Sequence, residues 1–323
     1  MKLIFIFSLP RSGSTLLQRL IASHPQISTT SEPWLILPYL YTIRDQGICA
    51  EFDYNTSSIA IQDFCRALPN GEEDYLLEVR ALIERLYAKI SREDKTTYFL
   101  DKTPRYHLVI NEIYKLFPES KKIFLWRNPL SVVTSIMNTW GQGKWNLYRY
   151  KIDLFQGLNS LIEAYQASSN EVASICFESL LVNPEDELDK IFSYLDLDFD
   201  SNSIASFHEM KLKGRTGDQV GVHEYQSISQ EPLEKWKNGI VNPVRKLWCR
   251  HYLKGIGREK LEIMGYDLDD LLVQIDSLPL GVSLTLSDVG RIMYGSAYCL
   301  LDPDLTKRKL KEASSWRKIV PYS

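Results

Sequence analysis

The chain has 323 residues, of which 44% are hydrophobic and 24% charged, with a formal net charge of −3 at pH 7. This composition is that of a globular protein with a sizeable core, and the slight negative charge argues against a general nucleic-acid-binding surface while allowing a local basic pocket. Its five cysteines lie far apart and form no C-x-x-C pair, which argues against a disulfide framework or a zinc site.

The sequence also predicts a cellular compartment. No stretch approaches the roughly 18–20 apolar residues that a membrane span requires. The apolar run at residues 2–9 is short, and no small-residue cleavage site of the A-x-A kind follows it, which argues against a signal peptide. We therefore expect a cytoplasmic protein with reduced cysteines, no membrane span and no nucleic-acid partner. The sequence leaves the oligomeric state open.

Predicted strands and helices alternate along the chain. Residues 2–9 form a continuous apolar run typical of a strand buried on both faces, and residues 14–23 carry leucines at helical spacing. Further strands are predicted in "QISTT", "TTYFLDKTP", "KKIFLWRNP" and "VASICFESLL", the last leading into a turn, and further helices in "DYLLEVRALIERLYAKI", "HLVINEIYKLFP", "LSVVTSIMNTW", "LFQGLNSLIEAYQ" and "NPEDELDKIFSYLDL". This order predicts an α/β fold, a three-layer sandwich with a central parallel sheet. We expect a single domain over residues 1–323, with a helical insertion at about 35–95 and a C-terminal extension at about 269–323.

The loop within "LPRSGSTLL" has the composition of an anion-binding site. It lies between a strand and a helix N-terminus, where free backbone N–H groups and the helix dipole favour negative charge. Gly13 permits close backbone approach, and Arg11 supplies a planar fork for phosphate oxygens. Hydroxyl donors come from Ser12, Ser14 and Thr15. The G-x-x-x-x-G-K-[ST] pattern of a nucleotide kinase is missing, and the plainer alternative is an ordinary capped turn.

A second strand–helix junction repeats this arrangement. The strand in "KKIFLWRNP" ends at Arg127, and a helix begins near Pro129, a favoured first helical position. Ser135 follows Arg127 by eight residues, about two turns into that helix. Together the two side chains could grip one phosphate. Taken singly, Arg127 is equally a surface ion-pair partner and Ser135 a small packing residue.

These two junctions resemble those of the sulfotransferases that use 3′-phosphoadenosine 5′-phosphosulfate (PAPS). In that family a strand–loop–helix like "LPRSGSTLL" holds the 5′-phosphosulfate, and an Arg followed eight residues later by Ser holds the 3′-phosphate. The resemblance continues in "FESLLVNPEDELDKIFSYLDL", "KLKGRTGDQ", "LEKWKN" and "IMGYDL", so it spans roughly residues 3–267. It implies that Lys213, Gly214 and Arg215 close over the nucleotide, with PAPS as co-substrate and the 3′,5′-bisphosphate PAP as product.

The resemblance also points to catalytic residues. Glu32 follows the "QISTT" strand, where open α/β sheets bind ligands, and tyrosylprotein and heparan sulfotransferases carry a catalytic glutamate at the matching place after "HP". Lys102 in "DKTPRYH" is expected to reach the bridging oxygen of the leaving group. Family members with "KTH" use that His as the base, whereas this chain has Pro104 there, which strengthens Glu32. We expect Asp101 to pair with Lys102 or an arginine.

Other side chains have weaker claims to a role in the site. His107 is a reserve base, His24 is expected to be structural, and His223 faces either substrate or solvent. Three tryptophans line an acceptor pocket or belong to the core, which is the commoner place for aromatic residues: Trp34, Trp140 and Trp145.

The sequence thus predicts a PAPS-dependent sulfotransferase that acts on a hydroxyl of a small molecule, a lipid or a glycan. No metal is required, because arginine, lysine and backbone N–H groups supply the electrostatics. One alternative is a P-loop-like small-molecule kinase, which predicts dependence on ATP and Mg²⁺. Another is a non-catalytic nucleotide-binding protein on the same fold, against which the presence of both Glu32 and Lys102 counts. The sequence does not identify the acceptor.

Overall fold

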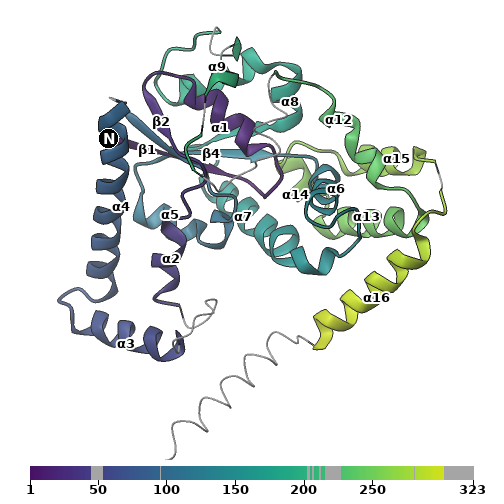
Figure 1. The fold of residues 1–323 in the computed structure, drawn as a ribbon, viewed down its shortest axis with the longest axis horizontal. Helices are drawn as coiled ribbons and strands as arrows, with labels where there is room; N and C mark the ends of the chain where they lie inside the picture. Colours follow the sequence, from purple (N-terminus) through teal and green to yellow (C-terminus); the bar gives the residue numbers. More distant parts are fainter. Residues whose placement is uncertain are drawn as a thin grey trace, which may run out of the picture.

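A five-stranded parallel sheet forms the centre of the molecule (Figure 1). The computed structural model describes residues 1–44, 54–94, 96–201, 204–205, 207–210, 212–214, 227–279 and 281–301. The sheet has the order β2-β3-β1-β4-β5, and every neighbouring pair is parallel. Its carboxyl ends therefore meet at one edge. The strands are β1 (Lys2–Phe7), β2 (Ile27–Thr29), β3 (Tyr98–Asp101), β4 (Lys121–Trp126) and β5 (Ala173–Cys176).

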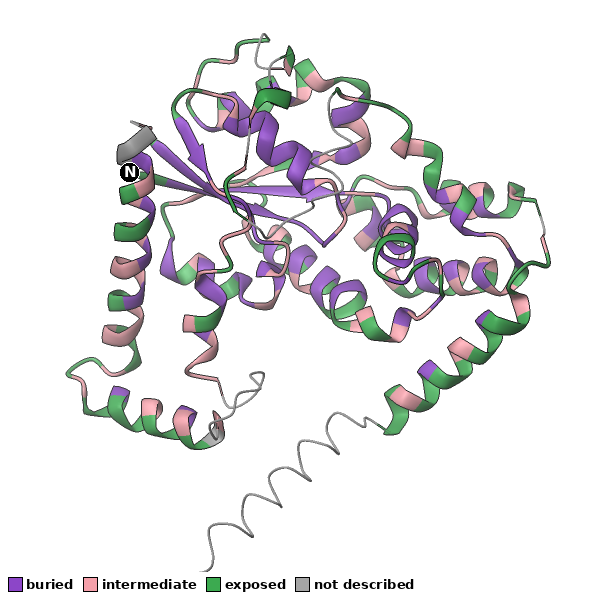
Figure 2. Ribbon diagram, viewed as in Figure 1, coloured by how far each residue is buried: buried purple, intermediate pink, exposed green. Residues whose placement is uncertain are grey.

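Alternate side chains of each strand enter two separate cores, because successive residues of a strand point to opposite faces. In β1, Phe5 and Phe7 enter one core and Ile4 and Ile6 enter the other. The strands β1 to β4 are almost wholly buried, as Figure 2 shows, whereas in the edge strand β5 only Ile175 is buried. The first core is closed by helices that include α5 (Ile110–Leu116), α6 (Pro129–Thr139), α7 (Leu158–Ser168), α13 (Pro243–Ile256) and α14 (Arg258–Ile263).

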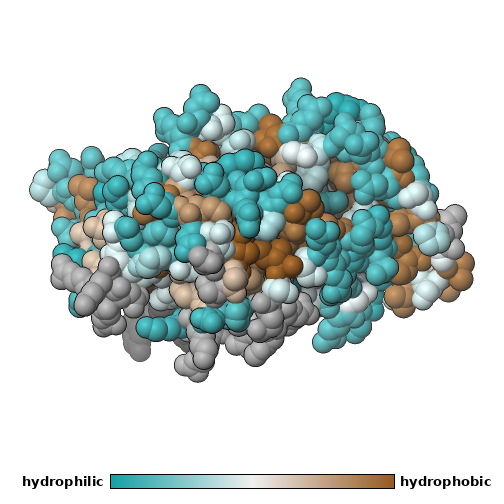
Figure 3. Space-filling view, turned by 90° about the horizontal axis from the view of Figure 1, so that it is seen from above, coloured by the Kyte–Doolittle hydropathy of each residue, from teal (hydrophilic) through white to brown (hydrophobic). Residues whose placement is uncertain are grey.

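Among the described residues, the helices that close the second core, on the opposite face of the sheet, include three α-helices. They are α1 (Ser14–Ala22), α8 (Phe177–Val182) and α9 (Pro184–Tyr194). The face at the top of Figure 1, where these helices lie, is largely hydrophilic with scattered hydrophobic patches, as expected for a layer that meets water (Figure 3). The three-layer arrangement around a parallel sheet that the sequence predicts is confirmed.

The helices predicted between residues 35 and 95 are present as α2 (Ile36–Tyr41), α3 (Tyr54–Ala67) and α4 (Glu72–Asp94). The last of these packs on the sheet, where the ring of Tyr87 stacks on Phe99 of β3 with a centroid distance of 4.1 Å. Among the described residues, no helix combines the length and the apolar character that crossing a membrane requires.

The chain leaves β5 earlier than the sequence predicts. The pattern "VASICFESLL" predicts a strand followed by a turn, whereas β5 ends at Cys176 and Phe177 begins the helix α8. The ring of Phe177 packs in the core beside α1, and this requirement takes the chain out of the sheet. A π-helical segment, η3 (Ile152–Gly157), also precedes α7 where one regular helix is expected. Shorter 3-10 segments are η1 (Tyr106–Leu108), η2 (Leu147–Tyr150), η4 (Phe207–Glu209) and η5 (Trp236–Gly239), the last directly after α12 (Pro232–Lys235).

The C-terminal region adds α15 (Leu268–Ser277) and α16 (Thr285–Leu301), and α16 projects from the body in Figure 1. One buried ion pair fastens α16 to α13. Arg245 Nε donates to Asp288 Oδ2 at 2.7 Å, and both side chains are almost fully buried, with relative exposures of 4% and 1%. The same guanidinium donates to the carbonyl oxygens of Gly239 and Gly143, both at 3.0 Å. Arg245 therefore joins α13, η5, the loop before η2 and α16.

We expect Asp288→Ala to loosen α16, because removing one partner leaves the guanidinium of Arg245 buried without its counter-charge. The opening free energy of α16, measured by native-state amide hydrogen exchange, should fall by about 3 kcal/mol. The matched control is Asp269→Ala, which removes a solvent-exposed partner of Arg258 and should leave exchange in α16 unchanged. Equal protection of α16 in the two variants would contradict this role for the buried pair.

Candidate active site

Four loops converge at the carboxyl edge of the sheet, which is where open α/β sheets bind ligands. The loop after β1 leads into α1, and residues 30–35 follow β2. Lys102 comes directly after β3, and Arg127 comes directly after β4. Parallel pairing therefore brings together residues from four separate parts of the chain.

Gly13 sets the shape of the loop after β1. Its φ of 85° lies in the left-handed region, and a Cβ at this position would lie 2.1 Å from Cε2 of Phe177. As the N-cap of α1, Gly13 offers no side-chain oxygen to the N–H groups of the first turn, which are the groups that bind anions. Arg11 also has a positive φ, of 66°. Three hydroxyl side chains of this loop and helix start are buried: Ser12, Ser14 and Thr15.

The two predicted phosphate-binding groups, which we call the clamps, are residues 11–15 and the pair Arg127 and Ser135. They are in direct contact. Arg127 Nη1 donates to the carbonyl oxygen of Arg11 at 2.8 Å, and Arg11 Nε donates to Ser135 Oγ at 3.3 Å. The guanidinium of Arg127 also lies over the ring of Phe177, 4.4 Å from its centroid. Arg11 thus connects the loop after β1 with α6 through its side chain, and with Arg127 through its backbone carbonyl.

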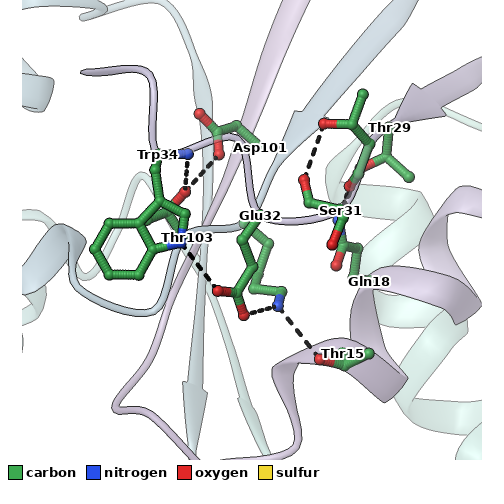
Figure 4. A network of polar contacts seen from close by, with 10 residues as sticks. Thr15, Gln18, Thr29, Ser31, Glu32, Trp34, Asp101 and Thr103 are labelled. Carbon is green, nitrogen blue, oxygen red and sulfur yellow. Dashed lines mark hydrogen bonds and ion pairs between the residues drawn. The ribbon is translucent and has the colours of Figure 1, made fainter. Parts of the chain in front are cut away.

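Glu32 and Lys102 form an ion pair beside the loop after β1. Lys102 Nζ lies 2.7 Å from Glu32 Oε1 and donates to Thr15 Oγ1 at 3.3 Å. The Lys102 side chain is only 1% exposed, while that of Glu32 is 12% exposed. The second oxygen of Glu32, Oε2, accepts from the indole Nε1 of Trp34 at 3.1 Å. Figure 4 shows the Glu32 carboxylate between the Trp34 indole and Thr15 at the start of α1.

The buried carboxyl of Asp101 lies at the end of β3, and Asp101 directly precedes Lys102 in the sequence. Its Oδ2 accepts from the hydroxyls of Tyr87 and Tyr106, both at 2.5 Å, and its Oδ1 accepts from Thr103 Oγ1 at 3.3 Å. Burial raises the pKa of Asp101 from 3.8 to about 6, against the opposing effect of these hydrogen bonds and of the nearby Lys102. The expectation that Asp101 pairs with Lys102 or an arginine is corrected, since its hydrogen bonds come from three hydroxyls.

The segment that contains "KLKGRTGDQ", which we call the late basic loop, approaches the same edge of the sheet. The backbone N–H of Ser31, next to Glu32, donates to the carbonyl oxygen of Lys213 at 2.9 Å. Gly214 has a φ of 136°, and a Cβ there would lie 2.8 Å from Cβ of Ser31. Arg215 and His223 lie outside the described residues. On the far side of this segment, Arg19 of α1 donates to the carbonyl oxygen of His208 at 2.8 Å, which ties η4 to α1.

A family model described as "Sulfotransferase family" matches residues 4–201, which is more than half of the chain. The chain belongs to the sulfotransferase family. The matched range contains the loop after β1, Glu32, Lys102, Arg127 and Ser135, and it ends before the late basic loop.

Several individual proteins are similar to this chain. The nodulation protein NoeE of Sinorhizobium fredii is 32% identical over 137 residues, which are 42% of this chain and 31% of that protein. A putative protein-tyrosine sulfotransferase of Caenorhabditis briggsae is 27% identical over 285 residues, which are 82% of this chain and 89% of that protein. The chain thus matches nearly all of one relative and less than a third of the other. A solved sulfotransferase domain from the curacin biosynthetic pathway shares the fold, with a TM-score of 0.52 and 20% identity over 73% of this chain and 90% of that one.

The fold of this sulfotransferase brings most of the predicted site residues together. The loop after β1, Arg127 and Ser135 form the joined clamps, while Glu32 and Lys102 form the adjacent pair. Phe177 and Trp34 have structural roles here that the sequence does not reveal. Phe177 lies 164 residues beyond Gly13, so no local pattern reports their contact. For Trp34, the one available signal is its place two residues after Glu32.

The histidines and tryptophans considered in the sequence analysis have other surroundings. His107 is buried, and its Nε2 lies 3.0 Å from Asp153 Oδ1, so it belongs to the packing around η3. His24 packs on Phe192, and burial lowers the pKa of its imidazole. Trp145 is a core residue at 1% exposure, whereas Trp34 and Trp140 are exposed. In the part of the chain that the structure describes, no three His, Cys, Asp or Glu side chains gather in a way that could hold a metal ion.

We expect Gly13→Ala to destabilise the protein, because the new Cβ meets the ring of Phe177 at a positive φ. The free energy of unfolding, measured by urea denaturation, should fall by about 2–4 kcal/mol. The matched control is Gly143→Ala, where φ is 75° but nothing lies within 4 Å of the new Cβ, so only the backbone strain of about 1 kcal/mol applies. Equal losses in the two variants would show that the contact with Phe177 is not tight.

Asp101 should give the protein a distinct pH dependence of stability. Its pKa is about 6 in the folded chain, against 3.8 for an unperturbed aspartate, so the folded state binds its proton more tightly. Its contribution is therefore fully present below pH 4 and is lost as the pH rises through 6, by up to about 3 kcal/mol.

Urea denaturation of the wild type and of Asp101→Asn at pH 4, 5, 6 and 7 checks this expectation. The difference in unfolding free energy, wild type minus variant, should decrease from pH 4 to pH 7. A difference that is constant or that increases over this range would contradict the burial of an ionisable Asp101 carboxyl.

Proposed function

We propose that this sulfotransferase transfers a sulfuryl group from PAPS to a hydroxyl of a small-molecule, lipid or glycan acceptor. The observation that carries the proposal is the line of contacts from Glu32 through Lys102 to Thr15. It joins a carboxylate to the start of α1, directly after the loop that we propose holds the 5′-phosphosulfate. Transfer to a hydroxyl needs a base and a bound donor held in line, and this arrangement can supply both.

The joined clamps support PAPS as the donor, since this nucleotide carries phosphate groups at both ends of its ribose. In the proposal, Arg11 and residues 12–15 hold the 5′-phosphosulfate, while Arg127 and Ser135 hold the 3′-phosphate. The contacts that Arg11 makes with both Arg127 and Ser135 support a single ligand across the two clamps. PAPS supplies the sulfuryl group and leaves as PAP.

The late basic loop has a proposed role as a cover over the nucleotide. Lys213 and Gly214 lie against Ser31, beside the Glu32 loop, and this placement supports the role. Arg215 is assigned to the same cover by its place in "KLKGRTGDQ".

The proposed chemistry assigns one task to each member of the pair. Glu32 takes the proton from the acceptor hydroxyl, and Lys102 stabilises negative charge on the leaving phosphate oxygen. The proposal assigns no metal, because Arg11, Arg127 and Lys102 provide positive charge together with the N–H groups of the first turn of α1. In the proposal the acceptor approaches from the side of Trp34, a residue beside Glu32 that is 37% exposed.

We expect Glu32→Gln to lower kcat by at least 100-fold, because it removes the base and keeps the shape of the side chain. Turnover is measured with ³⁵S-labelled PAPS, and PAP affinity is measured by calorimetry. PAP affinity should stay within about threefold of wild type. The matched control is Glu84→Gln on α4, a half-exposed partner of Arg80, which should leave both quantities unchanged. Wild-type turnover in Glu32→Gln would remove Glu32 from the mechanism.

The same assays separate the alternatives. Acceptors are screened as sugars, lipids, small alcohols and tyrosine peptides, the last because relatives of this chain include protein-tyrosine sulfotransferases. Tighter binding of ATP with Mg²⁺ than of PAP would favour the kinase. Tight PAP binding with no transfer to any acceptor class would favour a non-catalytic nucleotide-binding protein.

A further inference from the structure

Both carboxylate oxygens of Glu32 are held, and each is held from a different part of the chain. Lys102 Nζ lies 2.7 Å from Oε1, and the indole Nε1 of Trp34 donates to Oε2 at 3.1 Å. In Figure 4 the indole approaches the carboxylate with its N–H edge. A carboxylate fixed at one oxygen can still turn about its terminal torsion, whereas contacts at both oxygens fix the plane of the group.

The backbone of Trp34 is in an unusual conformation. Its φ is 54°, in the left-handed region that bulky residues rarely adopt. Such a conformation persists where surrounding contacts impose it, and these residues cluster at functional sites. Here the backbone N–H of Trp34 donates to Thr103 Oγ1 at 3.3 Å.

Thr103 is itself fixed by the buried cluster at the end of β3. It donates to Asp101 Oδ1 at 3.3 Å, and Asp101 is held by the hydroxyls of Tyr87 and Tyr106. Thr103 and Asp101 are each only 1% exposed. The strained backbone of Trp34 is therefore tied to a buried, hydrogen-bonded cluster at the end of β3.

Packing does not account for the place of Trp34. The residue is 37% exposed, whereas Trp145 is 1% exposed in the core. Burial therefore stabilises Trp34 less than it stabilises a core tryptophan, while the strained backbone conformation remains a cost. The contact that distinguishes it is the hydrogen bond from its indole to Glu32.

We propose that Trp34 is a positioning residue for Glu32, with its indole N–H orienting the carboxylate and with Thr103 setting its backbone. The inference rests on the proposed role of Glu32 as the base. A base held in one orientation meets the acceptor hydroxyl in the productive geometry more often, so the effect belongs to kcat rather than to nucleotide binding.

The direct test is Trp34→Phe, which keeps an aromatic ring and removes the N–H donor. We expect kcat to fall about tenfold or more, with the KM for PAPS and the affinity for PAP unchanged. The matched control is Trp248→Phe on α13, at a partly buried tryptophan that stacks on Tyr252 with a centroid distance of 5.0 Å, and it should leave kcat unchanged. Thr103→Val should lower kcat in the same way, and Thr103→Ser, which restores the hydroxyl, should recover it.

A double-mutant cycle separates positioning from a general structural effect. If Trp34 acts through Glu32, adding Trp34→Phe to Glu32→Gln should cause no further loss of turnover. The inference is overturned if Trp34→Phe reduces the residual turnover of Glu32→Gln by the same factor as in wild type. It is equally overturned if Trp34→Phe and Trp248→Phe have equal kcat while Glu32→Gln is inactive.

A spectroscopic measurement without substrate tests the contact between Trp34 and Glu32 independently of the reaction. In protein labelled with 5-fluorotryptophan, the ¹⁹F resonance lost in Trp34→Phe identifies Trp34. That resonance should shift in Glu32→Ala and in Thr103→Val and stay in place in Glu84→Gln. An unshifted resonance in Glu32→Ala would overturn the contact itself. Wild-type turnover in Glu32→Gln together with a shifted resonance would instead overturn the proposed base and leave the contact standing.

Discussion

The site depends on one buried cation, the ammonium group of Lys102. Its side chain is 1% exposed, and a charge taken out of water at such a depth costs several kcal/mol unless partners replace the lost hydration. The Glu32 carboxylate and the Thr15 hydroxyl are two of these partners, and they come from the loops after β2 and β1. Burying Lys102 therefore requires three strand ends to stay together, and the same requirement places a carboxylate beside the loop after β1.

Much of this arrangement follows from the sequence because its signals are local. The buried strand, the single glycine and the hydroxyls of "LPRSGSTLL" lie within a few residues of one another, and so do Arg127 and Ser135. Parallel pairing then brings the ends of the strands to one edge without further information. Local pattern and sheet topology together account for the joined clamps and for the closeness of Glu32 and Lys102.

The parts that the sequence does not predict depend on packing between distant residues. The sequence places Asp101 beside a cation, yet Tyr87 of α4 and Tyr106 of η1 supply its hydrogen bonds. The sequence around each tyrosine does not predict a contact with Asp101, since each tyrosine also fits an ordinary core position. The strand β5 ends early for a similar reason, because the ring of Phe177 is needed between Gly13 and Arg127.

Two buried ion pairs in the same molecule differ in how far they are closed to water. Arg245 and Asp288 are both closed to water, and backbone carbonyls and Asn242 complete their hydrogen bonds, so the pair has no exposed side. Lys102 is buried as deeply, but its partner Glu32 keeps 12% of its side chain exposed beside a solvent-facing indole. A carboxylate that must exchange a proton with an incoming hydroxyl needs such an opening. The asymmetry of the Lys102–Glu32 pair is therefore what the proposed chemistry requires, and a fully closed pair at this position would have held the fold without serving the reaction.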